Sequence, residues 1–416
     1  MNTNNGMGQL QIQPPTKLEL SEFGIPESNI KIVDTVEEIR NGIPNIIVAE
    51  CINDVAFIQN NFKLQKMAKK NQYCMSLGVY TQLKFDIKRN IKILRPGKYK
   101  FKNIYKPYSG QSLNNKNLLI FRTGGIGDLL FINPIIKYLK ELYPTCKISL
   151  ACGPQYQPMV ETFEGIDKLY DLPFNASILF DNHYHAIFEG IIERTRESEK
   201  TNAYTLFSKS LGLDIPVEKL VPHQKPKEDK VVECKKVLET WNILDKPFVL
   251  LQPRASSPIR TPRFDFWEKI INRLVELDYN IILTDSPHQK DKLDKFIFGL
   301  KNRNRVYNFC GHSKSLDYTI ALASLTSLIV ATDSALIHIG ASLSKPIMGI
   351  YGPFPGHIRM STYPNCDWIE PTGYKCCPCF QHGHLPCKYS KNGYPTCYDQ
   401  IEMDECYSKI EKLLNL

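Results

Sequence analysis

The 416-residue chain contains no long uncharged hydrophobic run. A membrane-spanning helix needs about 20 consecutive apolar residues, and no segment of this sequence approaches that length. Residues 1–17, MNTNNGMGQLQIQPPTK, are polar and lack the apolar centre of a secretory signal. These absences exclude an integral membrane protein and favour a cytoplasmic one.

Acidic residues are fewer than basic ones, 43 against 52, which leaves a net charge of +9. The excess is either an ordinary solvated surface or a source of attraction for an anionic partner, such as a phosphorylated substrate or an acidic lipid surface. Residues 84–102 interleave lysines with aromatics but match no nucleic-acid-binding module, so we expect no nucleic acid partner. Peripheral contact with a membrane through residues 84–108 remains a hypothesis.

The 13 cysteines do not form the two C-x-x-C pairs of a zinc ribbon, although seven of them lie between residues 366 and 406. Without a secretory signal, stable disulfides are not expected. We therefore expect small buried thiols and no metal. The alternative, which His382 and His384 leave open, is zinc bound by Cys377, Cys379, Cys387 and Cys397.

A glycine-rich turn lies within residues 117–130, NLLIFRTGGIGDLL. The apolar run 118–121 predicts a strand covered on both faces. Three glycines then predict a tight turn that a ligand can approach closely: Gly124, Gly125 and Gly127. Asp128 follows at the carboxyl end of the strand, where open α/β sheets bind substrates. The dinucleotide fingerprint would require a glycine in place of Leu130, so a nicotinamide cofactor is not indicated.

Strands and helices alternate from residue 116 onward, which predicts parallel βαβ units. The polar segment 222–230 divides this pattern into two Rossmann-like halves that face one another across a cleft. The expected strands are 118–121, 147–152, 168–173 and 185–190 in the first half, and 248–253, 280–285, 306–311, 327–332 and 346–352 in the second.

The residues before 116 predict a small α/β module of their own. Strand-like runs occupy 45–51 and 74–80, and residues 57–69 predict a helix. Short antiparallel strands are expected within 81–115, leading into a connector.

A second turn, Asp333 to His338, follows the buried strand 327–332 and opens a helix over 335–343. A helix N-terminus presents unpaired N–H groups and about half a positive charge, so it suits a diphosphate. The alternative is structural: Asp333 and Ser334 would only cap the helix, and His338 would be a core histidine.

Together the two turns resemble a known family. The pattern F-R-x-G-G-I-G-D-x-L-x-x-x-P-x-I, followed by D-S-x-x-x-H-x-x-A-x-L-x-K-P-x-x-x-I-Y-G-P, closely resembles glycosyltransferase family 9, which includes the lipopolysaccharide heptosyltransferases. Residues 252–270 and the C-C-P-C-F tail are also similar to the family. The resemblance begins at residue 117 and leaves 1–115 outside.

The resemblance implies an α/β fold of GT-B type with two Rossmann-like domains, to which this chain adds the N-terminal α/β module. We expect an N-terminal extension of unknown role at 1–115 and an acceptor-side domain at 116–225. A nucleotide-sugar-binding domain would span 226–365, and a Cys-rich tail with a C-terminal helix would span 366–416.

The resemblance also implies inverting, metal-independent transfer of a heptose-like sugar from a nucleotide-diphosphate donor, with ADP-heptose as the best-known donor. The acceptor would be a glycan or glycolipid of the lipopolysaccharide type, and no cofactor is expected. Asp128 matches the catalytic base. The expected donor-binding residues are Gly125, Gly127, Ser256, Arg260, Asp333, Ser334, Ala335 and His338.

Several alternatives remain open. Arg254 or Arg263 could replace Arg260 as the donor-binding cation. The chain could be an inactive sugar-nucleotide-binding or scaffold protein with the same fold. It could also be a nucleotide-sugar epimerase or hydrolase.

Overall fold

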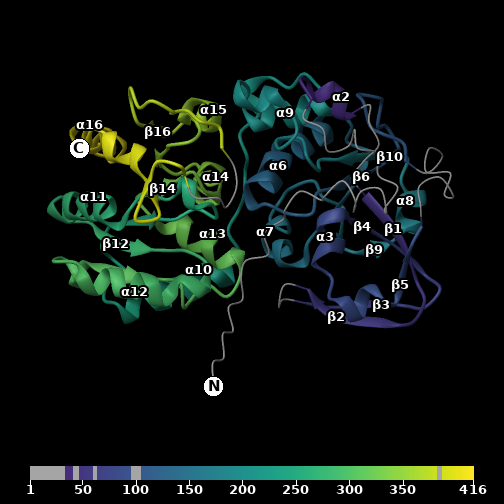
Figure 1. The fold of residues 1–416 in the computed structure, drawn as a ribbon, viewed down its shortest axis with the longest axis horizontal. Coiled ribbons are helices and arrows are strands. Elements are labelled where there is room, and N and C mark those ends of the chain that lie inside the picture. The colour runs from purple at the N-terminus through teal and green to yellow at the C-terminus, as the bar shows by residue number, and fades with distance from the viewer. Residues whose placement is uncertain (1–32, 41–45, 60–62, 95–104, 382–386) are drawn as a thin grey trace.

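The computed structural model describes residues 33–40, 46–59, 63–94, 105–381 and 387–416. They form two lobes that lie side by side (Figure 1), one from the N-terminal half of the chain and one from the C-terminal half. Within the described ranges, every helix is too short or too polar to cross a bilayer.

The first lobe is built on a parallel sheet with strand order β10-β6-β7-β8. Its strands are β6 (Asn117–Phe121), β7 (Lys147–Cys152), β8 (Lys168–Asp171) and β10 (Tyr184–Ile187). Its helices are α6 (Ile126–Leu142), α7 (Gln157–Val160), α8 (Ser177–Asp181) and α9 (Ala203–Ser210). The strands expected from the βαβ pattern are confirmed in this lobe.

Strand β6 divides its side chains between two cores. Leu118 and Ile120 lie in the core that contains α6 and α9, whereas Leu119 and Phe121 lie in a second core with the N-terminal strands. Successive side chains of a strand point to opposite faces, so each face of β6 needs its own cover. The N-terminal module therefore covers the face that helices cover in an ordinary doubly wound sheet.

The N-terminal module is an antiparallel sheet with strand order β5-β1-β4-β9. Its strands are β1 (Ile46–Cys51), β4 (Gln72–Ser76), β5 (Ile91–Ile93) and β9 (Phe174–Asn175). Strand β9 comes from the first Rossmann-like half, so the two sheets interlock. The remaining helices here are α2 (Val36–Arg40), α3 (Leu77–Gln82) and α4 (Phe85–Lys88).

The helix expected over residues 57–69 is wrong. The structure has an antiparallel hairpin of β2 (Val55–Gln59) and β3 (Lys63–Met67). In β3 the buried side chains Gln65 and Met67 alternate with exposed ones, which is the period of a strand.

The strand expected over 74–80 is half right, because β4 ends at Ser76. The Ser76 hydroxyl accepts a hydrogen bond from the Val79 amide at 3.1 Å and caps helix α3. Part of the segment 81–115 lies outside the described residues. Its described part contains α4 as well as the short strand β5.

The second lobe contains a parallel sheet with strand order β13-β12-β11-β14-β15-β16. Its strands are β11 (Phe248–Gln252), β12 (Asn280–Leu283), β13 (Val306–Asn308), β14 (Leu328–Thr332), β15 (Ile347–Ile350) and β16 (Cys366–Ile369). The helices are α10 (Glu228–Thr240), α11 (Phe264–Glu276), α12 (Lys290–Gly299), α13 (Leu316–Leu325), α14 (Ala335–Ser342), α15 (Gly356–Met360) and α16 (Met403–Leu413), and a small ribbon pairs β17 (Ser390–Lys391) with β18 (Tyr394–Pro395). The expected strands are confirmed, and β16 extends the sheet past residue 365.

The lobes are joined by packing and by a polar bridge. Helix α6 packs against α14, where the two lobes meet in Figure 1. Gln224 hydrogen-bonds Ser342 of α14 through its backbone amide at 2.9 Å and through its side chain at 2.8 Å. Its side-chain amide also donates to Thr162 of the first lobe at 2.8 Å. The third residue of the segment predicted as a linker, 222–230, is thus hydrogen-bonded to both lobes.

Candidate active site

The glycine-rich turn has the shape that its glycines allow. Gly125 has φ +88°, and a Cβ there would overlap the carboxylate of Asp128. Gly124 lies against the ring of Tyr156, where a Cβ would also overlap. A side chain at Gly125 would strain the backbone or displace the carboxylate, and one at Gly124 would displace the Tyr156 ring.

Asp128 lies in the first turn of α6, and its side chain is 20% exposed. The Nη2 of Arg122 donates to this carboxylate and also lies 3.2 Å from Glu193. The other guanidinium nitrogens of Arg122 donate to the carbonyl oxygens of Gly124 at 2.9 Å and Phe188 at 2.8 Å. A single buried guanidinium therefore fixes the turn, the segment after β10 and the candidate base.

The groups around Asp128 shift its pKa in opposite directions. Burial raises the pKa of Asp128, the Arg122 guanidinium lowers it, and the carboxylates of Glu193 and Glu189 raise it again. The net direction is upward. A raised carboxyl pKa strengthens a base, provided that the group is still ionised at the working pH.

The donor-side candidates gather at the carboxyl ends of β11 and β14. Arg260 donates from Nη1 to the Asp333 carbonyl oxygen at 2.9 Å and from Nη2 to the Ser256 hydroxyl at 3.0 Å. Its Nη1 also lies 3.4 Å from the Asp333 carboxylate. The structure therefore brings Ser256, Arg260 and Asp333 together, as expected for one binding site.

The N-terminus of helix α14 has no side-chain cap. Ser334 occupies the cap position, but its hydroxyl donates to the Gln252 side chain at 2.8 Å. The amides of the first turn, which begins at Ala335, therefore receive no capping oxygen from Ser334. Uncapped N-terminal amides and the helix dipole together favour an anion.

His338 joins the two turns. A Cβ on Gly127 would lie 3.0 Å from Cδ2 of His338, and the ring of Phe131 from α6 meets the His338 ring edge-on, with centroids 4.8 Å apart. The Nδ1 of His338 pairs with the Tyr363 hydroxyl at 2.5 Å, and that hydroxyl pairs with Tyr204 at 2.8 Å. Burial lowers the pKa of His338 to about 4, so the ring is neutral near pH 7.

His338 is thus 5% exposed and held between the lobes. Its contact with Gly127 brings the first turns of α6 and α14 together, although they are about 200 residues apart in the sequence. The two motifs therefore lie together where the lobes meet.

Comparison with known proteins shows the family of the chain. The sequence profile of glycosyltransferase family 9 (heptosyltransferase) matches residues 176–388, which is half of the chain. The chain belongs to glycosyltransferase family 9.

Relatives of this family 9 enzyme match it over most of their own length and share its fold. Lipopolysaccharide heptosyltransferase 2 of Escherichia coli K12 is 26% identical, over 57% of this chain and 82% of that protein. The structure of the E. coli ADP-heptose lipopolysaccharide heptosyltransferase II superimposes with a TM-score of 0.55 at 14% identity, covering 72% of this chain and 98% of that one. The architecture is therefore the GT-B fold.

A third similar structure extends further along the chain. TibC of enterotoxigenic E. coli, an iron-containing dodecameric glycosyltransferase, has a TM-score of 0.52 at 14% identity. It covers 90% of this chain and 92% of its own. Because residues 117–416 are less than three quarters of the chain, this likeness in fold includes part of the N-terminal module.

Arg254 and Arg263, the two alternatives to Arg260, form ion pairs with carboxylates other than that of Asp333. Arg254 Nε lies 3.6 Å from the carboxylate of Asp285, after β12. Arg263 lies 3.0 Å from both Asp265 and Asp399. Of the three arginines considered, Arg260 is the one at Asp333.

The cysteines of the tail are free thiols. Cys377 lies within hydrogen-bonding distance of Cys397, which raises the Cys377 pKa, and Tyr389 donates its amide to Cys387 at 3.4 Å. Among the residues that the structure describes, no group of three His, Cys, Asp or Glu side chains is arranged to hold a metal ion. His382 and His384 lie outside the described residues.

The sequence analysis assigns no role to four charged residues of the site: Arg122, Glu189, Glu193 and Arg359. Arg122 stands inside the resemblance motif. Glu189, whose carboxylate accepts from the Thr123 amide, directly follows the apolar run of β10. The carboxyl end of each parallel strand was a signal that could have found Glu189. Arg359 of α15 is 8% exposed, and its guanidinium lies 4.4 Å from the centroid of the Phe354 ring. Its charge acts on His338, but no feature of the sequence indicates that the two residues are close.

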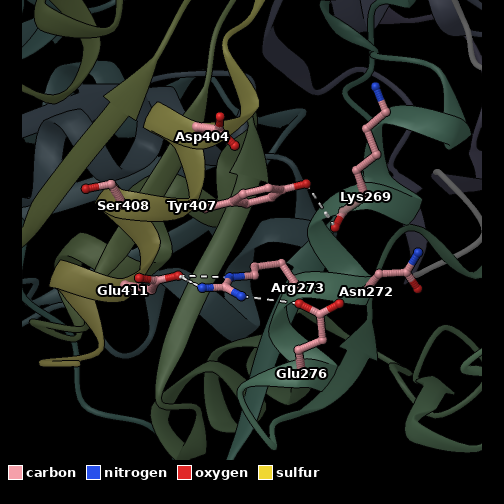
Figure 2. Close-up of a pocket in the computed structure, with 8 residues that line it drawn as sticks. All are labelled: Lys269, Asn272, Arg273, Glu276, Asp404, Tyr407, Ser408 and Glu411. Carbon is pink, nitrogen blue, oxygen red and sulfur yellow. Dashed lines mark hydrogen bonds and ion pairs between the residues drawn. The ribbon is translucent and has the colours of Figure 1, made fainter.

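A cavity of about 600 Å³ lies outside this site, between α11 and α16. Figure 2 shows that three of its charged side chains turn toward one another: Arg273 binds Glu411 at 2.6 Å and lies 3.3 Å from Glu276. Both helices lie on the side of their lobe away from the other lobe (Figure 1). Because it lies away from both motifs and Arg273 already binds two carboxylates, this cavity is a poor candidate for the donor.

Proposed function

We propose that this family 9 enzyme transfers a heptose-like sugar from a nucleotide-diphosphate donor to a hydroxyl of a glycan or lipopolysaccharide-type acceptor, with inversion and without a metal. One observation carries the proposal. The turn that carries Asp128 lies against His338 of α14 through Gly127, and Arg260 lies beside the uncapped N-terminus of that helix.

In the proposed reaction, the acceptor oxygen attacks the anomeric carbon as Asp128 takes the hydroxyl proton. The bond between that carbon and the diphosphate oxygen breaks, and the nucleoside diphosphate leaves with the electron pair. Attack opposite the leaving group inverts the anomeric centre. General base catalysis of this kind contributes about 10²–10⁴-fold.

The donor side supplies positive charge where negative charge develops. Arg260 offers two donors to phosphate oxygens, and the amides of Ser334 and Ala335 offer more, with the dipole of α14 behind them. Fixed donors aimed at a leaving group stabilise the transition state without reorganisation. Gly125, Gly127 and His338 would border the sugar, because the two motifs lie against one another at Gly127 and His338.

The likeness to the E. coli ADP-heptose heptosyltransferase II supports ADP-heptose as the donor, and the lipopolysaccharide heptosyltransferase relative supports a glycolipid acceptor. We place the enzyme in the cytoplasm, at the inner face of a membrane.

The decisive experiment is Asp128→Asn. ADP binding measured by calorimetry should be within about twofold of wild type, whereas transfer should fall by about 10²–10⁴-fold. Asp265→Asn is the matched control, because Asp265 is an exposed aspartate in the first turn of α11. If Asp128→Asn keeps full transfer activity, the assignment of the base is wrong.

Product analysis separates the alternative functions. Binding without release of ADP in the presence of any acceptor would identify a scaffold protein, and free sugar released without an acceptor would identify a hydrolase. The proposed enzyme requires an acceptor, and the anomeric configuration of its product, read by NMR, is opposite to that of the donor.

Membrane contact has support from the N-terminal module. Residues 46–59 and 63–94 carry eight lysines and arginines against three acidic residues, a net +5 of the total +9. On α4, Phe85 is 76% exposed, with the guanidinium of Arg89 5.8 Å from its ring centroid. Vesicles containing anionic lipid should bind the wild type and should bind the double variant Lys84→Glu/Arg89→Glu much more weakly. Equal binding of the two proteins would refute the contact.

A further inference from the structure

Arg122 is buried at the centre of the acceptor-side motif, with its side chain 7% exposed. It directly follows β6, and its guanidinium nitrogens bind the carbonyl oxygens of Gly124 and Phe188 and the carboxylates of Asp128 and Glu193. These four partners belong to two separate segments, residues 124–128 and 188–193. A lysine offers a point charge in place of a planar fork and could not hold all four partners in this geometry.

One nitrogen of Arg122 serves two carboxylates. Its Nη2 donates to both Asp128 and Glu193, and Glu189 stands nearby on the same segment as Glu193. The partner from the opposite lobe, His338, lies against Gly127 and is neutral near pH 7. The charges that act on Asp128 are therefore one guanidinium and two further carboxylates.

We propose that Arg122 is a positioning residue, which holds the Asp128 carboxylate ionised and in place at the turn, and that Glu193 weakens this hold by competing for the same nitrogen. This inference rests on the proposed role of Asp128. It deepens that role, because it assigns the control of the base to residues that do not touch the substrate.

The two partners have opposite effects on Asp128. Without the guanidinium, a buried carboxyl beside two other carboxylates keeps its proton to higher pH, so Arg122→Met should move the acidic limb of the kcat profile upward by about 1–3 pH units. Without its competitor, the guanidinium binds Asp128 alone, so Glu193→Gln should move the limb downward. A residue with only a structural role would lower activity without moving the limb.

Arg122→Lys keeps the charge but loses the fork. We expect an acidic limb close to that of wild type, with a kcat lower by about tenfold or more because the carboxylate is no longer fixed in place. KM for the donor should change little in each of these variants, since Arg260 and α14 lie on the other lobe.

The control is Arg273→Met. Arg273 also binds a carboxylate, Glu411 at 2.6 Å, but it lies at the α11–α16 cavity (Figure 2), so its variant should keep the wild-type profile. Glu193 is 54% exposed, which makes Glu193→Gln unlikely to unfold the protein and keeps the test valid even where Arg122→Met does not fold.

The experiment is the pH dependence of kcat for the full chain with saturating ADP-heptose and acceptor, together with Asp128→Asn. If Asp128→Asn is inactive while Glu193→Gln and Arg122→Lys both keep the wild-type limb and kcat, the inference is refuted and the base assignment stands. If Asp128→Asn retains transfer, the proposed base is wrong and the inference fails with it.

Discussion

Removing the guanidinium of Arg260 is the sharpest test of the donor site. In Arg260→Ala, a nucleoside diphosphate loses its side-chain cation but keeps the amides of α14. The side chain is 17% exposed, so the site is largely shielded from solvent and the loss is not replaced fully by water. A hydrogen bond to a charged group contributes about 1.5–3 kcal/mol, which corresponds to a roughly 10–150-fold weaker Kd.

The effect on thermal stability follows from that change. A ligand at 100 times its Kd stabilises the native state by about 2.7 kcal/mol. A roughly 30-fold weaker Kd reduces this to about 0.9 kcal/mol at the same concentration. At about 2–4 °C per kcal/mol, the Tm increase with ADP should fall from about 5–11 °C to about 2–4 °C.

The assay is a thermal shift titration with ADP and ADP-heptose, with Kd confirmed by calorimetry. Arg263→Ala is the matched control, because Arg263 is bound to Asp265 and Asp399 and should leave the ADP shift unchanged. An Arg260→Ala protein that binds ADP within twofold of wild type would refute the donor-site geometry.

Three further predictions concern stability. Gly125→Ala should lower the unfolding free energy by about 1–3 kcal/mol and remove most of the activity, because φ is +88° and the added Cβ would overlap the Asp128 carboxylate. The assay is urea denaturation, and Gly299→Ala is the neutral control, because a Cβ added there meets no neighbouring atom within 4 Å. Phe121→Ala should cost about 3–5 kcal/mol in the same assay, whereas the 76% exposed Phe85→Ala should stay within about 0.5 kcal/mol. Because burial lowers the His338 pKa to about 4 from 6.5, the unfolded chain binds more protons between these values, and stability should fall as pH falls through that window. The urea midpoint of His338→Gln should decline less between pH 6.5 and 4.5, and an equal decline would contradict the assignment.

The parts of the site that lie on a single strand–turn–helix unit were predictable from the sequence. Asp333 directly follows the buried strand β14, and Asp128 lies in the helical turn that comes after the buried strand β6. The carboxyl ends of parallel strands lie at the same edge of a sheet, where ligands bind. The roles of the two aspartates stay predictions until the variants are measured. The alternation of strand and helix was sufficient to predict both Rossmann-like sheets, because parallel strands buried on both faces are continuous apolar runs.

The rest depended on tertiary contacts. Nothing local to Arg122 indicates that Glu193, 71 residues later, would share its nitrogen. The hairpin at 55–67 was mistaken for a helix because its apolar and polar residues fit both periods over so short a segment. The uniform apolar run of β6 also carries no signal of what covers each face.

The interlocking of the first two sheets has a consequence for synthesis on the ribosome. Strand β4 completes its edge only by pairing with β9, where Tyr73 lies opposite Asn175, about 100 residues later in the chain. Leu119 and Phe121 must also arrive before the second core can close. The N-terminal module is therefore synthesised before its partners, and we expect its sheet and core to stay incomplete until β6 and β9 have been translated.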